Sequence, residues 1–122
     1  METFFVEKRM TFAAAHWLSL PYVSPCTNPH GHEWVVKVGV KGSKLNEEGM
    51  LCDFKKIKDC INRKYDHSTL NDRLAFNPTA ENLSRQICKD INELLDEDIH
   101  TDAKCVRVEL WESESNRVVY EV

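Results

Sequence analysis

The 122-residue sequence has no long apolar run, no block of basic residues, no internal repeat and no Gly/Ser-rich linker. The missing apolar run excludes a membrane-spanning helix, and the missing basic block argues against a large nucleic-acid footprint. Residues 1–7 lack the basic start and apolar stretch of a secretion signal. A chain of this length holds one core, so we expect a single domain over residues 1–122.

Cysteine is present, but in an odd number, because the sequence has 5 cysteines and 5 histidines. An odd count without a secretion signal argues against a disulfide framework and predicts a reducing, cytoplasmic environment. The thiols are then core residues, metal ligands or nucleophiles. The remaining composition is typical of a globular protein, with 42% hydrophobic residues, 30% charged residues and a net charge of −4.

Alternating apolar and polar residues predict four strands. The first spans about Phe4 to His16, and the second spans about His30 to Val40. The stretch between them, Trp17 to Pro29, contains prolines and no periodicity, so we expect a loop. The third strand is expected around Val106 to Leu110, and the last at Val118 to Val122.

Two amphipathic helices are predicted between the strand pairs. Asp53 has the position of an N-cap for the first helix, and Thr79 begins the second. Their apolar stripes are Phe54, Ile57, Ile61 and Tyr65, then Leu83, Ile87, Ile91, Leu94 and Leu95. The segment Asp66 to Pro78 is expected to be a connector. The order β-β-α-α-β-β predicts an α+β fold, an antiparallel four-stranded sheet with two helices on one face.

Three histidines stand at the ends of the apolar rows of the first two strands. His16 takes the last core-facing position of the first strand, and His30 and His32 take the first two of the second. If these strands pair as an antiparallel hairpin, all three imidazoles converge on the covered face. Three histidines with one open position are the usual catalytic zinc arrangement. The alternative is that each is a core or rim histidine with an ordinary hydrogen bond.

Cys26 lies in the loop, shortly before His30. It either closes a structural zinc site as a fourth ligand or stays free beside the metal as a proton-accepting thiolate, and the spacing leaves both open. The other cysteines are expected to be small buried residues, namely Cys52, Cys60, Cys88 and Cys105.

Three further polar residues stand where predicted elements end. Asp66 and His67 follow the first helix directly, and Glu112 ends the apolar row of the third strand. Asp66 and His67 form either a proton relay or an ordinary helix C-terminus. Glu112 either accepts paired N–H donors of a heterocyclic ligand or meets water where the strand ends.

Six short motifs, in order over about Phe4 to Val122, resemble the 6-pyruvoyl-tetrahydropterin synthase superfamily. They are Phe12–His16, Cys26–His32, Gly49–Phe54, Asp66–Asn71, Asn77–Leu83 and Trp111–Ser113. The resemblance implies one such domain with the tunnelling fold, in which the sheets of several protomers join into a barrel. The assembly is commonly a hexamer of two trimers with pterin sites between subunits.

The short interval between Cys26 and His30 resembles the branch that forms 6-carboxytetrahydropterin for queuosine biosynthesis. Similar enzymes convert 7,8-dihydroneopterin triphosphate to 6-carboxy-5,6,7,8-tetrahydropterin, acetaldehyde and triphosphate. The resemblance also implies a zinc ion, Zn2+, bound by His16, His30 and His32.

Roles for five other residues follow from the same resemblance. Cys26 would be the catalytic base, and Asp66 with His67 the proton relay. Glu112 would bind the amino-pyrimidine edge of the pterin, with Thr79 as a neighbour.

The motif around Glu112 departs from the family pattern, because Ser113 and Glu114 follow it where a threonine and a turn are usual. Ser113 keeps the hydroxyl, but Glu114 adds a negative charge to a protein of net charge −4. The sequence does not identify which Lys or Arg would attract a triphosphate. Two other functions stay in competition, a 6-pyruvoyl-tetrahydropterin synthase that eliminates triphosphate and a non-catalytic, zinc-stabilised binding module.

Overall fold

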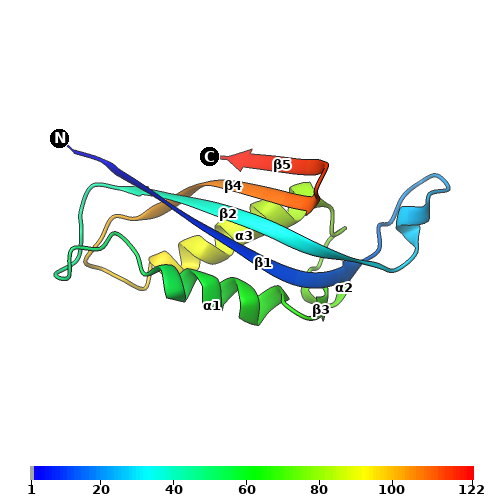
Figure 1. Ribbon diagram of the computed structural model, residues 1–122, viewed down its shortest axis with the longest axis horizontal. Coiled ribbons are helices and arrows are strands. Elements are labelled where there is room, and N and C mark those ends of the chain that lie inside the picture. Colours follow the sequence, from blue (N-terminus) through cyan, green and yellow to red (C-terminus); the bar gives the residue numbers. More distant parts are fainter. Residues whose placement is uncertain (1) are drawn as a thin grey trace.

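The computed structural model describes residues 2–122 and consists of one mixed sheet with helices packed on one face (Figure 1). The strand order in the sheet is β3-β1-β2-β4-β5. The elements are β1 (Phe4–His16), the 3-10 helix η1 (Pro25–Thr27), β2 (His30–Gly42), α1 (Phe54–Tyr65), β3 (Ser68–Thr69), α2 (Leu70–Arg73), α3 (Ala80–Leu95), β4 (Lys104–Ser113) and β5 (Asn116–Glu121).

The α+β class and the helix-covered sheet are confirmed, and the four expected antiparallel strands and two expected helices are present, but the structure adds a short fifth strand and a further short helix. The segment expected to be a connector contains the short strand β3 and the single-turn helix α2. β3 pairs in parallel with the end of β1, at Ala14 and Ala15, and makes the sheet mixed. A two-residue strand is too short to have a hydrophobic period, so the sequence pattern could not reveal it.

Burial follows the period-2 pattern of the long strands. On the helix-covered face Phe12, Trp34 and Val36 are buried, and the Phe12 and Trp34 rings are stacked with centroids 6.1 Å apart. The helices contribute the buried residues Ile57, Ile61, Tyr65, Leu83, Ile87, Ile91 and Leu95. Phe54 does not join this core, because its side chain is 46% exposed.

Both helices begin at the expected caps. The Asp53 side chain accepts a hydrogen bond from the Lys55 N–H, and the Thr79 hydroxyl accepts one from the Asn82 N–H. These bonds satisfy N–H groups that have no partner within the first helical turn. They fix where α1 and α3 start, and the start of α3 adjoins the site described below.

The cysteines outside the loop are mostly core residues, as expected. Cys60, Cys88 and Cys105 are buried, whereas Cys52 is only half-buried. Burial raises the pKa of the Cys52 and Cys60 thiols, so both remain protonated and unreactive at neutral pH. No helix among residues 2–122 is long and apolar enough to cross a membrane.

Candidate metal centre and adjoining cavity

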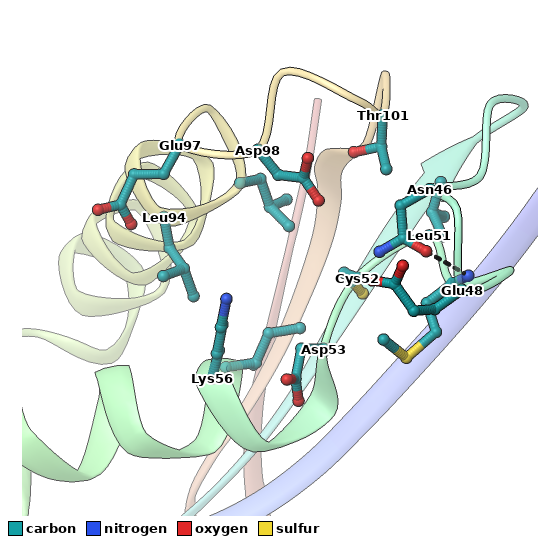
Figure 2. Close-up of a pocket in the computed structure, with 13 residues that line it drawn as sticks. Asn46, Glu48, Leu51, Cys52, Asp53, Lys56, Leu94, Glu97, Asp98 and Thr101 are labelled. Carbon is teal, nitrogen blue, oxygen red and sulfur yellow. Dashed lines mark hydrogen bonds between the residues drawn. The ribbon is translucent and has the colours of Figure 1, made fainter.

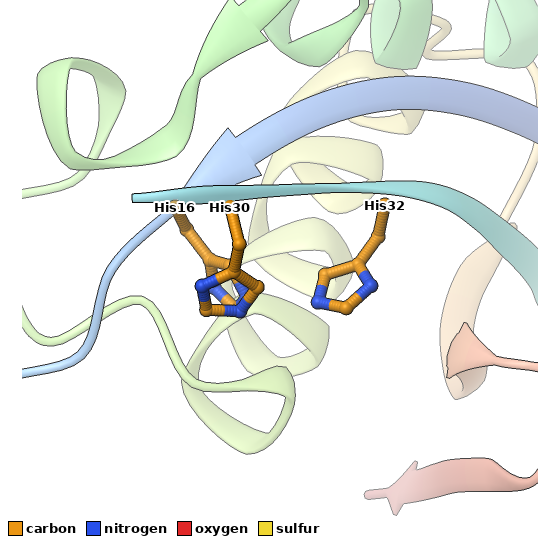
Figure 3. Close-up of side chains that lie close together, drawn as sticks. All are labelled: His16, His30 and His32. Carbon is orange, nitrogen blue, oxygen red and sulfur yellow. The ribbon is translucent and has the colours of Figure 1, made fainter. Parts of the chain in front are cut away.

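Three histidine side chains converge at the end of the β1–β2 ladder, as their spacing predicts (Figure 3). His16 pairs with His30 across the two strands, and Ala14 pairs with His32. This register puts all three rings on the helix-covered face, with ring centroids 4.6, 4.9 and 5.2 Å apart. One ligand atom from each lies within 4.8 Å of the others, which is close enough for the three to share one metal ion.

The backbone determines which ring nitrogens are free. The Nδ1 of His16 lies 2.8 Å from the Pro78 carbonyl oxygen, and the Nδ1 of His30 lies 2.8 Å from that of Asn28. A carbonyl only accepts, so both Nδ1 atoms carry the proton and both Nε2 atoms keep a lone pair. The Nε2 atoms of His16 and His32 are buried without a hydrogen-bond partner. Unpartnered buried nitrogens are unfavourable, and a cation between the rings would satisfy them.

The environment favours the neutral imidazole of His16 and of His32, which is the form that binds metal. Burial lowers the pKa of His16, although the bond to Pro78 and the nearby Glu112 carboxylate act in the opposite direction. Burial likewise lowers the pKa of His32. The Trp34 ring packs edge-on against both, at centroid distances of 5.1 and 5.4 Å. This apolar wall excludes water from one side of the histidine cluster.

Glu112 connects the histidine cluster to a cavity. Its carboxylate oxygens lie 3.7 Å from the Nε2 atoms of His16 and His32, and its side chain is 25% exposed. Glu112 also lines a hollow of about 500 Å³. Other residues that line this hollow are Leu18, Leu20, Tyr22 and Thr79. The hollow is also lined by Glu81, Asn116 and Arg117, and this mixture of apolar and polar side chains suits a flat, polar-edged heterocycle.

Cys26 lies in η1 and is exposed. Its N–H donates to the Ser24 hydroxyl, and its carbonyl oxygen accepts from the Leu18 N–H at 2.8 Å. Among residues 2–122, the group of converging metal-ligand atoms contains the three histidines and not this thiol. The exposure of Cys26 favours a free thiol over a fourth ligand.

Asp66 and His67 are not brought to the histidine cluster within one chain. Asp66 accepts a hydrogen bond from the Ala13 N–H, and the His67 N–H donates to the Ala13 carbonyl. The His67 side chain is 85% exposed and lines a shallow hollow with Gly31, Glu33 and also His32. Ala13, Gly31 and Glu33 alternate with the metal-site residues along their strands, so they face the opposite side of the sheet.

His67 also has a left-handed backbone conformation, with φ at 55°. This region is sparsely populated by residues other than glycine. The His67 N–H donates to the Ala13 carbonyl at 2.7 Å, and the preceding Asp66 carboxylate accepts from the Ala13 N–H at 2.9 Å, which holds His67 in this conformation. The imidazole and the Asp66 carboxylate, 3.5 Å apart, are thus presented together on the surface.

Two asparagines that sequence reasoning missed hold the loop over the cavity. The Asn71 amide accepts from the Trp17 N–H and donates to the Trp17 carbonyl, and Asn77 does the same with Ser19. Each side-chain amide makes the two hydrogen bonds that a neighbouring strand would make with that backbone. Together they hold the loop 17–28 against the segment before α3. The only signal was their presence in the Asp66–Asn71 and Asn77–Leu83 motifs, because their partners lie more than 50 residues away in sequence.

A second hollow, of about 330 Å³, lies at the opposite end of the sheet between α1 and α3 (Figure 2). Lys56 extends into it, and the Asn46 side chain accepts from the Met50 N–H at 2.9 Å. Its acidic lining residues are Glu48, Asp53, Glu97 and Asp98. Within the described chain these carboxylates do not form a converging ligand group, so this hollow is not the candidate site.

Comparisons with known proteins agree with the fold. The chain matches the 6-pyruvoyl tetrahydropterin synthase family over residues 5–122. It is 30% identical to 6-carboxy-5,6,7,8-tetrahydropterin synthase of Bacillus subtilis, over 97% of this chain and 85% of the relative. It is 32% identical to dihydroneopterin monophosphate aldolase of Pyrococcus furiosus, over 85% of each chain.

The fold also matches a solved structure. The 6-pyruvoyl tetrahydropterin synthase of Caenorhabditis elegans superposes with a TM-score of 0.77 at 24% identity, over 100% of this chain and 97% of that one. Fold and site together define a tunnelling-fold chain with a group of three histidines that could hold a metal ion. The chain belongs to the 6-pyruvoyl tetrahydropterin synthase family.

Proposed function

We propose that this protein is a zinc-dependent 6-carboxy-5,6,7,8-tetrahydropterin synthase, a cytoplasmic carbon–carbon lyase of queuosine and 7-deazapurine biosynthesis. It would convert 7,8-dihydroneopterin triphosphate to 6-carboxytetrahydropterin, acetaldehyde and triphosphate. The observation that carries the proposal is the convergence of three histidine nitrogens beside a cavity that contains a carboxylate. The similarity to the Bacillus subtilis enzyme supports the substrate class.

The three histidines would hold the zinc ion through their Nε2 atoms. When bound, zinc would supply Lewis-acid stabilisation of negative charge on the side-chain oxygens of the substrate. Glu112 would accept the paired N–H donors at the amino-pyrimidine edge, and Thr79, which lines the same cavity, would flank the ring. The Cys26 thiolate would take a proton from the substrate side chain.

Asp66 and His67 would relay protons in the active site of another copy of the chain. Their position on the opposite face of the sheet supports a site completed between subunits. The protein would be a homo-oligomer, a hexamer of two trimers. This assembly would bring the Asp66–His67 relay of one protomer to the histidines of the next.

A product assay tests the proposed reaction. The protein is incubated with 7,8-dihydroneopterin triphosphate, with and without a chelator, and pterins and acetaldehyde are quantified. We expect 6-carboxytetrahydropterin and equimolar acetaldehyde, both abolished by the chelator and restored by zinc. Triphosphate release without acetaldehyde would instead identify a 6-pyruvoyl-tetrahydropterin synthase.

The similarity to a dihydroneopterin monophosphate aldolase makes the monophosphate a second substrate to test. Cleavage of the monophosphate at a much higher kcat/KM than the triphosphate would favour aldolase activity. No turnover of either substrate, together with loss of zinc in a Cys26→Ala variant, would favour the zinc-stabilised binding module. Retained zinc with abolished turnover in that variant supports the enzyme.

Complementation tests the shared site. The His30→Ala and His67→Ala variants should each be inactive alone. If each site takes these residues from different copies, random mixing during co-expression leaves about a quarter of sites with both residues intact. Activity near that level is expected, and none would mean that both residues serve the site of their own chain.

A further inference from the structure

Glu112 stands at an irregular point of the sheet, and its side chain faces both the histidine cluster and a cavity. The β4–β5 register shifts between Trp111 and Ser113, so Glu112 is the extra residue of a β-bulge. Bulges redirect side chains and are common beside active sites. From this position the carboxylate lines the 500 Å³ cavity and also reaches the histidine cluster.

The distances to the histidines are those of a fellow metal ligand. One carboxylate oxygen lies 3.7 Å from the Nε2 of His16, and the other lies 3.7 Å from the Nε2 of His32. Both are too long for hydrogen bonds. In a tetrahedral zinc site with bonds of roughly 2.0–2.1 Å, neighbouring ligand atoms are roughly 3.3–3.4 Å apart. Glu112 lies outside the converging group of the three histidines, so its carboxylate would have to move toward them for a four-ligand set to form.

The free lone pairs point to the same arrangement. The Nδ1 of His16 donates to the Pro78 carbonyl, so the Nε2 that faces Glu112 offers a lone pair rather than a proton. The Nε2 lone pair of His16 and the Glu112 carboxylate repel each other unless a cation lies between them. Of the described carboxylates, Glu112 is the one paired with two of the three histidines.

We propose that Glu112 is the fourth metal ligand in the substrate-free protein and leaves the metal when its carboxylate turns into the cavity to bind a pterin ring. One carboxylate then couples recognition of the ring to the opening of a coordination position for the substrate side chain. The release step rests on the proposed function, whereas the resting ligation rests on the geometry alone.

Cobalt substitution tests the resting ligation without any turnover. Metal-free protein is titrated with Co2+, and its visible ligand-field spectrum and affinity are recorded for the wild type, Glu112→Gln and Glu114→Gln. We expect Glu112→Gln to change the intensity and position of the bands and to weaken binding about tenfold or more. Glu114→Gln, which removes a neighbouring exposed charge, should leave the spectrum unchanged.

The spectrum decides between ligation and mere proximity. Removal of a nearby negative charge weakens cation binding even when that charge is not a ligand, but it does not alter the ligand field. Weaker binding with a wild-type spectrum would therefore overturn the proposal, as would no change in either quantity.

A second measurement tests release. A pterin without a side chain at C6 is added to the Co2+ protein, and binding is followed by pterin fluorescence. We expect a spectral change in the wild type, and none in Glu112→Gln, whose fourth ligand is already lost. Binding without a spectral change in the wild type would overturn the release step. Failure of the pterin to bind would overturn release together with the proposed function, while the titration above still judges resting ligation.

Discussion

His16 lies directly opposite His30 in the β1–β2 ladder, and the centroids of their rings are 4.6 Å apart. Each ring is oriented by a backbone carbonyl, from Pro78 and Asn28 respectively. The ligand set is therefore held by strand pairing and by two loop carbonyls before any metal arrives. Such orientation of ligands is what gives a metal site its affinity.

Loss of one histidine should remove the metal without unfolding the chain. His30→Ala deletes a half-buried ligand at the start of β2 and leaves the buried His16 in place. We expect zinc affinity to fall by more than the roughly 10–100-fold that follows loss of an outer partner. Zinc content after dialysis, measured by mass spectrometry, checks this, with exposed His100→Ala as the matched control. Equal zinc in both variants would contradict the three-histidine site.

The hydrogen bonds between the Asn77 side chain and the Ser19 backbone should hold the loop 17–28 in place over the cavity. Asn77→Ala removes the two hydrogen bonds with the Ser19 backbone, at 2.9 and 3.1 Å. Because these bonds are exposed, the expected loss of stability is at most about 1–2 kcal/mol. Limited proteolysis should detect faster cleavage within residues 17–29. Wild-type cleavage rates would show that the loop is held by other contacts.

The buried carboxylate of Asp90 depends on its partners. It is 4% exposed and accepts hydrogen bonds from Tyr65, Lys64 and Gln86. Burial, followed by the bond to Asp90, raises the pKa of Tyr65, so the phenol remains a donor at every working pH. Tyr65→Phe should lower the free energy of unfolding by about 1–3 kcal/mol in urea titrations. Tyr22→Phe, at a position that is 64% exposed, should change it by far less.

Asp102 should give the protein a pH-dependent contribution to stability. Hydrogen bonds from the Lys44 N–H and from the hydroxyl and N–H of Ser43 lower its pKa from 3.8 to about 2. A carboxyl group whose pKa is lower in the folded state stabilises the fold above its unfolded pKa, and that effect is lost as pH falls through the folded value. Asp102→Asn should therefore unfold at a lower temperature than the wild type at neutral pH.

The gap between the two melting temperatures should shrink as pH falls from about 4 to about 2. Thermal melts followed by circular dichroism check this, and the exposed Asp72→Asn serves as a control with no comparable trend. If the difference between the two melting temperatures is the same at every pH, the effect of Asp102→Asn comes from altered packing or hydrogen-bond geometry and not from the loss of the carboxylate charge.

The sequence alone determined the metal-ligating face. Period-2 alternation put His16, His30 and His32 in apolar rows, and strand pairing left little freedom in where their rings meet. The helix starts at Asp53 and Thr79 were likewise predictable, because side-chain capping is a local interaction.

Only the tertiary structure decided the rest. The Pro78 carbonyl that orients His16 and the asparagine hydrogen bonds that hold the loop both join segments far apart in sequence. The face on which His67 projects depends on the hydrogen bonds of Asp66 and His67 with Ala13, which a periodic pattern does not contain. Periodicity reports which side of a strand is buried, whereas hydrogen bonds between distant segments determine what is placed next to it.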